Sequence, residues 1–75
     1  MEKYKDLNGD SGVSGYEITP TWIRVQFKDG SIYEYDNNKP GLVHVNKMKA
    51  LALAGDGLNS YIGLVVKKNY ARKII

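Results

Sequence analysis

The sequence predicts an α+β domain, with a three-stranded antiparallel β-meander packed by one or two C-terminal helices. Alternating apolar and polar residues fill positions 22–28 and resume after an Asp-Gly turn at 29–30. Beyond position 40 the apolar residues change to a spacing of three and four. Strands followed by helices, rather than alternating with them, are typical of the α+β class.

The chain is short and contains no cysteine. Its 75 residues, 43% hydrophobic and 25% charged, suit one small soluble domain with a limited core. The absence of cysteine excludes disulfides, thiolate metal sites and thiol nucleophiles, and no apolar run approaches the ~20 residues of a membrane helix. We expect a cytoplasmic protein with no membrane partner, in which residues 1–10 form a flexible arm and residues 11–75 form a single domain.

Three strands are predicted between residues 12 and 36. The stretch "SGVSGYEI" at 11–18 is weakened by glycine, which favours an edge strand. Residues 19–21, "TPT", form a turn into the second strand. That strand places Ile23, Val25 and Phe27 on one face and Trp22, Arg24, Gln26 and Lys28 on the other.

The turn at "FKDGSIYEYD", residues 27–36, allows two registers for the second hairpin. A two-residue loop at Asp29-Gly30 would place Val25 opposite Glu34. Apolar side chains would then face carboxylates, and burying an unpaired carboxylate costs several kcal/mol.

The other register uses a type I turn with Gly30 as a G1 bulge. Arg24 then faces Glu34, while Ile23 and Val25 face Tyr35 and Tyr33. All the apolar side chains share one face, so we favour this register. It predicts that Tyr33 and Tyr35 are core residues, whereas in the two-residue register they would form an external stacking surface.

Two helices are predicted after the sheet. The stretch "NNKPGLVHVNKMKALALAG" has Pro40 as a start signal and Gly55 as a stop signal, and Val45, Met48, Leu51 and Ala52 share one side of a helix. In "LNSYIGLVVKKNYARKII" the apolar residues Leu58, Tyr61, Ile62 and Val65 follow a helical spacing. Gly63 and the β-branched valines weaken this second helix, so a short strand at 61–66 stays as the alternative.

No catalytic or metal-binding signature is found. His44 is the only histidine and has no second ligand at helical spacing, so we interpret it as a residue at the rim of the core. The "GDG" at 55–57 lacks the Lys-Ser or Lys-Thr of a phosphate-binding loop and is better explained by helix ends. We therefore expect a protein that is not an enzyme and that uses no cofactor and no metal.

Basic residues crowd the C-terminal end of the chain. Lys67, Lys68, Arg72 and Lys73 fall within seven positions, more than a helix end needs for its dipole. If they share a surface with Trp22, Arg24 and Lys28, they could contact phosphates beside an aromatic ring. This pattern suggests weak RNA binding without sequence specificity. The alternative is a protein-interaction or self-association module that uses a sheet edge or exposed Trp22 and Ile32.

Several motifs in this order resemble the KTSC domain, a small module named from the C-terminus of some lysyl-tRNA synthetases and also found as a stand-alone bacterial or phage protein. They are "SGVSGYE" at 11–17, "VQFKDGSIYEY" at 25–35, Pro40, and "LAGDGLNSYI" at 53–62. The family has no established activity. Its synthetase association implies RNA as a partner, while the short 19–21 turn and the basic C-terminus depart from the commoner pattern.

Overall fold

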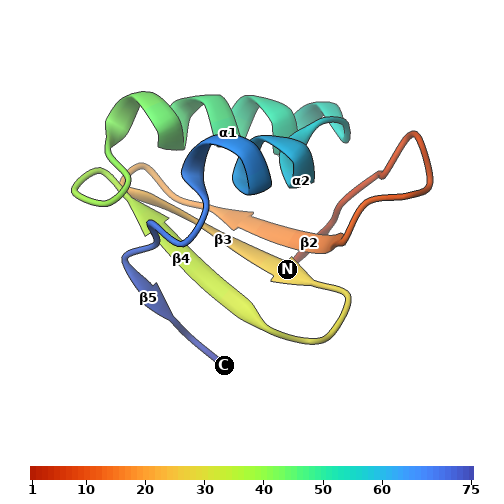
Figure 1. The fold of residues 1–75 in the computed structure, drawn as a ribbon, viewed down its shortest axis with the longest axis horizontal. Helices are drawn as coiled ribbons and strands as arrows, with labels where there is room; N and C mark the ends of the chain where they lie inside the picture. Colours follow the sequence, from red (N-terminus) through yellow and green to blue (C-terminus); the bar gives the residue numbers. More distant parts are fainter.

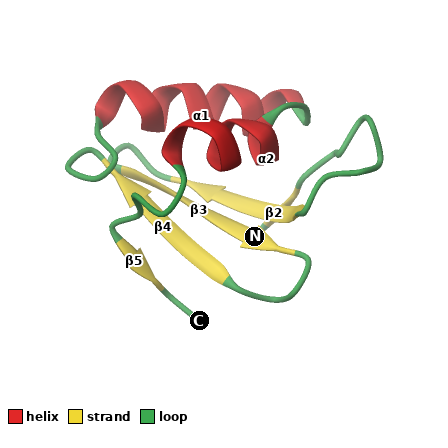
Figure 2. Cartoon of the chain, viewed as in Figure 1, coloured by secondary structure: helices red, strands yellow, loops and turns green.

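The structure is a computed structural model that describes residues 1–75, and it forms a five-stranded antiparallel sheet with its helices on one face (Figures 1 and 2). The strands, in sheet order, are β1 (Glu2–Lys3), β2 (Val13–Ile18), β3 (Trp22–Phe27), β4 (Ile32–Asp36) and β5 (Arg72–Lys73). Helix α1 covers Leu42–Ala54, and α2, Leu58–Tyr61, continues into a π-helical turn, η1, at Ile62–Val66. The other face of the sheet is open (Figure 1). No helix is long and apolar enough to cross a membrane.

The core lies between the sheet and the helices. Ile23 and Val25 of β3 are completely buried against Val45 and Met48 of α1. The remaining buried apolar side chains are Tyr4, Val13, Tyr35, Ala52, Leu58, Ile62 and Val66. The predicted α+β class and the central three-stranded meander are confirmed, and the sheet gains one further strand at each edge.

The hairpin between β3 and β4 has the bulged register. Ile23 pairs with Tyr35, Arg24 with Glu34 and Val25 with Tyr33. At the turn the Gly30 N–H donates to the Phe27 carbonyl at 2.9 Å, and Gly30 has φ +93°, which glycine adopts without steric cost. The predicted register is confirmed, because it alone keeps Glu34 away from the apolar face.

Both predicted helices are present. Helix α1 ends at Ala54, and Gly55 follows it as the C-cap, with a φ of +74° that is the left-handed conformation expected of a glycine at this position. Residues 58–66 are helical, so the strand alternative for 61–66 is wrong. The interior Gly63 and the paired valines instead coincide with the π-helical turn, a widened backbone often found at functional sites.

The N-terminal ten residues contact the fold at several points, in contrast to the expected flexible arm. Glu2 and Lys3 pair with β2. Tyr4 is only 2% exposed, and its hydroxyl accepts a hydrogen bond from the Leu58 N–H at 3.3 Å. A strand of two residues and a single buried tyrosine produce no periodic pattern in the sequence. These contacts could therefore not be predicted from a segment that is otherwise polar.

The C-terminal strand β5 was not predicted. Arg72 and Lys73 pair with Glu34 and Tyr33 of β4, and the Ala71 N–H donates to the Glu34 carbonyl at 2.8 Å. A short, charged edge strand is a common way to discourage edge-to-edge pairing between proteins. β1 and β5 therefore shield the edges that the self-association alternative would use.

Candidate nucleic-acid interface

The structure divides the predicted basic residues between two faces of the sheet. The predicted set is Lys67, Lys68, Arg72, Lys73, Arg24 and Lys28. Arg24 and Arg72 lie opposite Glu34 on the open face. Lys73 lies opposite Tyr33 on the helix-covered face, and Lys67 and Lys68 follow η1 on that same side. The prediction that all six residues share a single surface is therefore wrong.

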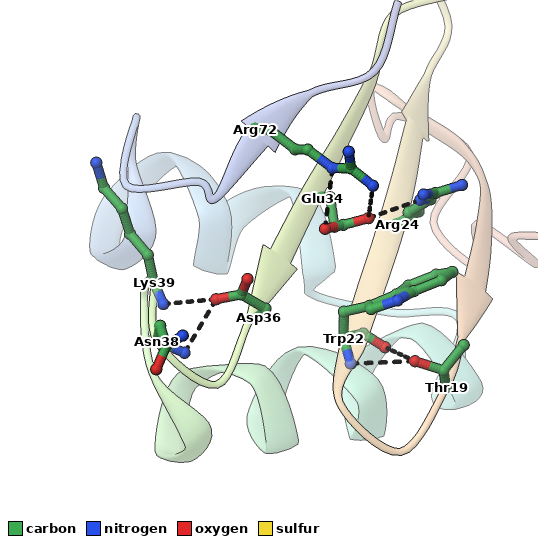
Figure 3. A network of polar contacts seen from close by, with 8 residues as sticks. All are labelled: Thr19, Trp22, Arg24, Glu34, Asp36, Asn38, Lys39 and Arg72. Carbon is green, nitrogen blue, oxygen red and sulfur yellow. Dashed lines mark hydrogen bonds and ion pairs between the residues drawn. The ribbon is translucent and has the colours of Figure 1, made fainter.

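Glu34 holds both arginines on the open face (Figure 3). Its Oε1 accepts from Arg24 Nε at 2.9 Å and its Oε2 accepts from Arg72 Nε at 3.2 Å. Burial by itself raises the pKa of Glu34, but the hydrogen bonds and charges of Arg72 and Arg24 together outweigh burial and hold the pKa below its ordinary value. Both arginines thus form ion pairs with the buried carboxylate of Glu34.

Trp22 completes this open-face cluster. The Arg24 guanidinium lies 4.4 Å from the centre of the Trp22 ring, a cation–π contact that covers the indole. The register continues the charge pattern across the sheet, since Glu17 of β2 lies opposite Arg24. Positive and negative side chains alternate along this row, so the open face offers no uniform positive potential to a polyanion.

Lys28 is also engaged within the protein. Its Nζ lies 3.1 Å from Asp6 Oδ2, and Asp6 in turn accepts a hydrogen bond from the Ser11 N–H. Burial raises the pKa of Asp6, but these hydrogen bonds and the Lys28 charge outweigh it and lower the pKa overall. Lys28 is 54% exposed, so this ion pair is weak and solvent-screened.

Three lysines of the predicted set have no carboxylate within ion-pair distance, as is also true of Lys3, Lys5, Lys39, Lys47 and Lys49 elsewhere in the chain. Those of the predicted set are Lys67, Lys68 and Lys73, and all three are exposed. Lys67 ends η1 with φ +55° and ψ −128°, a conformation that side-chain-bearing residues rarely adopt. A lysine in a backbone position suited to glycine is strained, and such strain is found most often at functional sites.

An aromatic groove lies beside these lysines. Its volume is about 350 Å³, and it is lined by Phe27, Tyr33, Tyr35, Ile62, Lys67, Lys68 and Tyr70. Tyr33 stands at the centre of the aromatic cluster, with ring centroids 4.7 Å from Tyr70 and 5.8 Å from Phe27. Lys73 Nζ lies 5.7 Å from the Tyr33 centroid. Cations and aromatic rings thus meet at the end of η1.

The two tyrosines of β4 differ in burial although they share a face. Tyr35 is 2% exposed, and burial, with smaller contributions from Tyr33 and Tyr70, raises its pKa to about 12. Tyr33 is half-buried and packs on the margin of the core. The core prediction is confirmed for Tyr35, whereas Tyr33 serves the core on one side and the groove on the other.

Tyr70 is the groove residue that sequence reasoning missed. It comes from the loop between η1 and β5, so its position depends on a strand that was not predicted. The signal was available in the sequence, because "KKNYARK" places an aromatic residue inside the basic run. Such interleaving is typical of segments that contact both bases and phosphates.

His44 lies at the contact between α1 and α2. Its Nδ1 is 2.7 Å from the Tyr61 hydroxyl, and the residue is half-buried, as expected for a histidine at the rim of the core. No three His, Asp or Glu side chains come together in an arrangement that could hold a metal ion.

The apolar residues of the alternative interaction surface are not strongly exposed. Trp22 and Ile32 are both half-buried. The most exposed large apolar side chains lie instead on the helical layer, where Val43 is 80% and Leu64 78% exposed.

Comparison of the chain with models of protein families, with curated proteins and with solved structures finds no significant match in any of the three.

Proposed function

We propose that this protein is a non-catalytic accessory module that binds nucleic acid weakly and without sequence specificity, through the basic surface at its C-terminal end. The observation that carries the proposal is that Lys67 and Lys68 line one aromatic groove while Lys73 lies 5.7 Å from the Tyr33 ring in its wall, with none of the three paired with a carboxylate. The resemblance to the KTSC domain and its synthetase association agree with RNA as the partner. Arg24 and Arg72 are left out of the proposed surface because both are ion-paired with Glu34 and lie on the other face of the sheet.

Charge counting sets the expected strength of binding. Each phosphate neutralised on a single strand contributes about −0.7 to the slope of log K against log salt concentration. Three lysines therefore predict a slope of about −2, and roughly twentyfold weaker binding between about 50 and 200 mM salt. Because only three cations contribute, binding should be weak at physiological salt. Weak binding suits an accessory module that acts together with another nucleic-acid-binding protein or domain.

The test is fluorescence anisotropy of a labelled mixed-sequence RNA of about ten nucleotides, a length within the range of small single-strand binders. Replacing Lys67 and Lys68 together by glutamine should lower the slope to about −0.7. The matched control replaces Lys3 and Lys5 by glutamine, the same charge change at the opposite edge of the sheet. The proposal fails if wild type does not bind at low salt, or if both double variants weaken binding equally.

The second candidate function is a protein-interaction or self-association module. The observation in its favour is the exposure of Val43 and Leu64 on the helical layer, rather than Trp22 or Ile32. Sedimentation at rising protein concentration tests self-association. Self-association that persists at high salt and is lost on Leu64→Ser would favour this candidate over RNA binding.

A further inference from the structure

The Phe27–Tyr33 pair separates two hollows on the helix-covered side of the sheet. One is the groove of about 350 Å³ that also contacts Tyr70 and the two lysines after η1. The other, of about 440 Å³, is also lined by Phe27 and Tyr33, together with Lys28 and Asp29. The two rings meet edge to face at 79°, so together they form a ridge with a hollow on each side. We call the first hollow the lysine groove and the pair the aromatic ridge.

The lysine groove combines two properties that single out one class of ligand. Its walls are mainly aromatic, with Tyr33 and Tyr70 at 4.7 Å, while its only charged lining residues are Lys67 and Lys68. Its volume falls within the range of about 300 to 1,000 Å³ that is usual for ligand sites. A planar ring attached to an anion satisfies both the walls and the rim. An acidic peptide would use the lysines and leave the aromatic surface without a partner.

Lys73 is placed to take part without holding a fixed internal bond. Its Nζ lies 5.7 Å from the Tyr33 centroid, close to the limit of about 6 Å for a cation–π contact. A cation held so loosely can turn from the ring to a phosphate when a base covers that ring. Lys67, with φ +55°, lines the same groove.

We infer that the lysine groove is a site for one unpaired nucleobase, with its phosphate between Lys67 and Lys68 and the neighbouring nucleotide across the aromatic ridge. This inference rests on the proposed nucleic-acid function and adds selectivity for single strands. A duplex keeps its bases stacked inside and can reach only the lysines, whereas a single strand gains both phosphate contacts and aromatic stacking. Stacking tolerates any base, so the site has no sequence preference.

The first test compares three probes of equal phosphate number on the wild-type protein: a single-stranded oligouridylate, an RNA duplex, and a strand of abasic sugar-phosphate. The inference expects the oligouridylate to bind about 5- to 150-fold more tightly than the abasic strand, from stacking of one base. Equal affinity for all three probes would overturn the base site while leaving the electrostatic surface standing. No binding of any probe at low salt would overturn the proposed function as well.

The second test uses variants. Tyr33→Leu and Tyr70→Leu should weaken oligouridylate binding by a similar factor and leave the salt slope near −2, because they remove stacking and no charge. Tyr16→Leu is the matched control, since Tyr16 is also half-buried against the core but lies on β2 in a different hollow. Binding unchanged by both groove substitutions, or weakened equally by Tyr16→Leu, would overturn the inference.

A stacking signature keeps the test independent of folding defects in the variants. An oligonucleotide that carries 2-aminopurine loses fluorescence when that base stacks on an aromatic ring. We expect quenching by wild type that is retained by Tyr16→Leu. Saturating binding without any quenching would place the base outside the groove and contradict the inference.

Discussion

Replacement of Tyr35 by alanine tests the hairpin register and the division of labour between the two tyrosines of β4. Tyr35 is 2% exposed, in contact with Tyr70 at a centroid distance of 6.5 Å and opposite fully buried Ile23. Removal of a buried aromatic ring costs about 3 to 5 kcal/mol. A 75-residue domain has a total stability of only about 4 to 11 kcal/mol, so Tyr35→Ala should remove a large part of the free energy of unfolding.

Tyr33→Ala should cost about 1 to 2 kcal/mol, because that ring is half-buried and part of its surface already contacts water in the groove. Urea unfolding followed by circular dichroism measures both variants. Tyr35→Leu, which keeps an apolar side chain in the cavity, gives a folded intermediate case with a loss of about 1 to 3 kcal/mol. Equal losses for Tyr33→Ala and Tyr35→Ala, or a larger loss for Tyr33→Ala, would refute the assignment of Tyr35 to the core.

Three further predictions follow from single side chains. Glu34→Gln should destabilise the protein by about 1 to 2 kcal/mol, because its ion pairs are lost. Since the pKa of Glu34 is lowered in the folded state, its contribution to the free energy of unfolding is present above about pH 4.3 and is lost as pH falls further. Acid unfolding of wild type and variant measures this difference. The pKa of Tyr35, raised to about 12, favours the neutral form in the folded state. Its contribution to the free energy of unfolding is therefore complete below about pH 10 and declines from there towards pH 12. Tyr35→Phe should lessen that decline, as measured by alkaline unfolding. Lys67→Gly should raise the free energy of unfolding by about 1 kcal/mol, because glycine adopts φ +55° without strain. The same substitution should weaken RNA binding, because it removes a lysine. A loss of stability in thermal unfolding would contradict the strained conformation of Lys67.

Local patterns decided those parts of the fold that could be predicted from the sequence. The alternation of Ile23, Val25 and Phe27, with Glu34 opposed to Arg24, fixed both the face and the register of the β3–β4 hairpin. Gly55 likewise marked the end of α1. In each case a neighbour within a few residues, or one bulged turn, settled the geometry.

Contacts between distant segments decided the rest. Tyr4 and Leu58 are 54 positions apart, and Arg72 and Glu34 are 38 positions apart. Strands of two residues carry no measurable period, so neither β1 nor β5 could be found by pattern. Because β5 was not predicted, Arg72 and Lys73 were assigned to one surface. Only the pairing of β5 with β4 shows that Arg72 lies opposite Glu34 while Lys73 lies opposite Tyr33.

The central claim is that the lysines at the C-terminal end and the aromatic groove bind a single nucleic-acid strand as one surface. The most direct measurement is an amide NMR titration of the labelled protein with a single-stranded RNA at low and then physiological salt. The account predicts shifts at Lys67, Lys68 and Lys73 together with Tyr33 and Tyr70, all of which shrink as salt rises. Shifts confined to Trp22 and Arg24 on the open face, or no shifts at low salt, would contradict it.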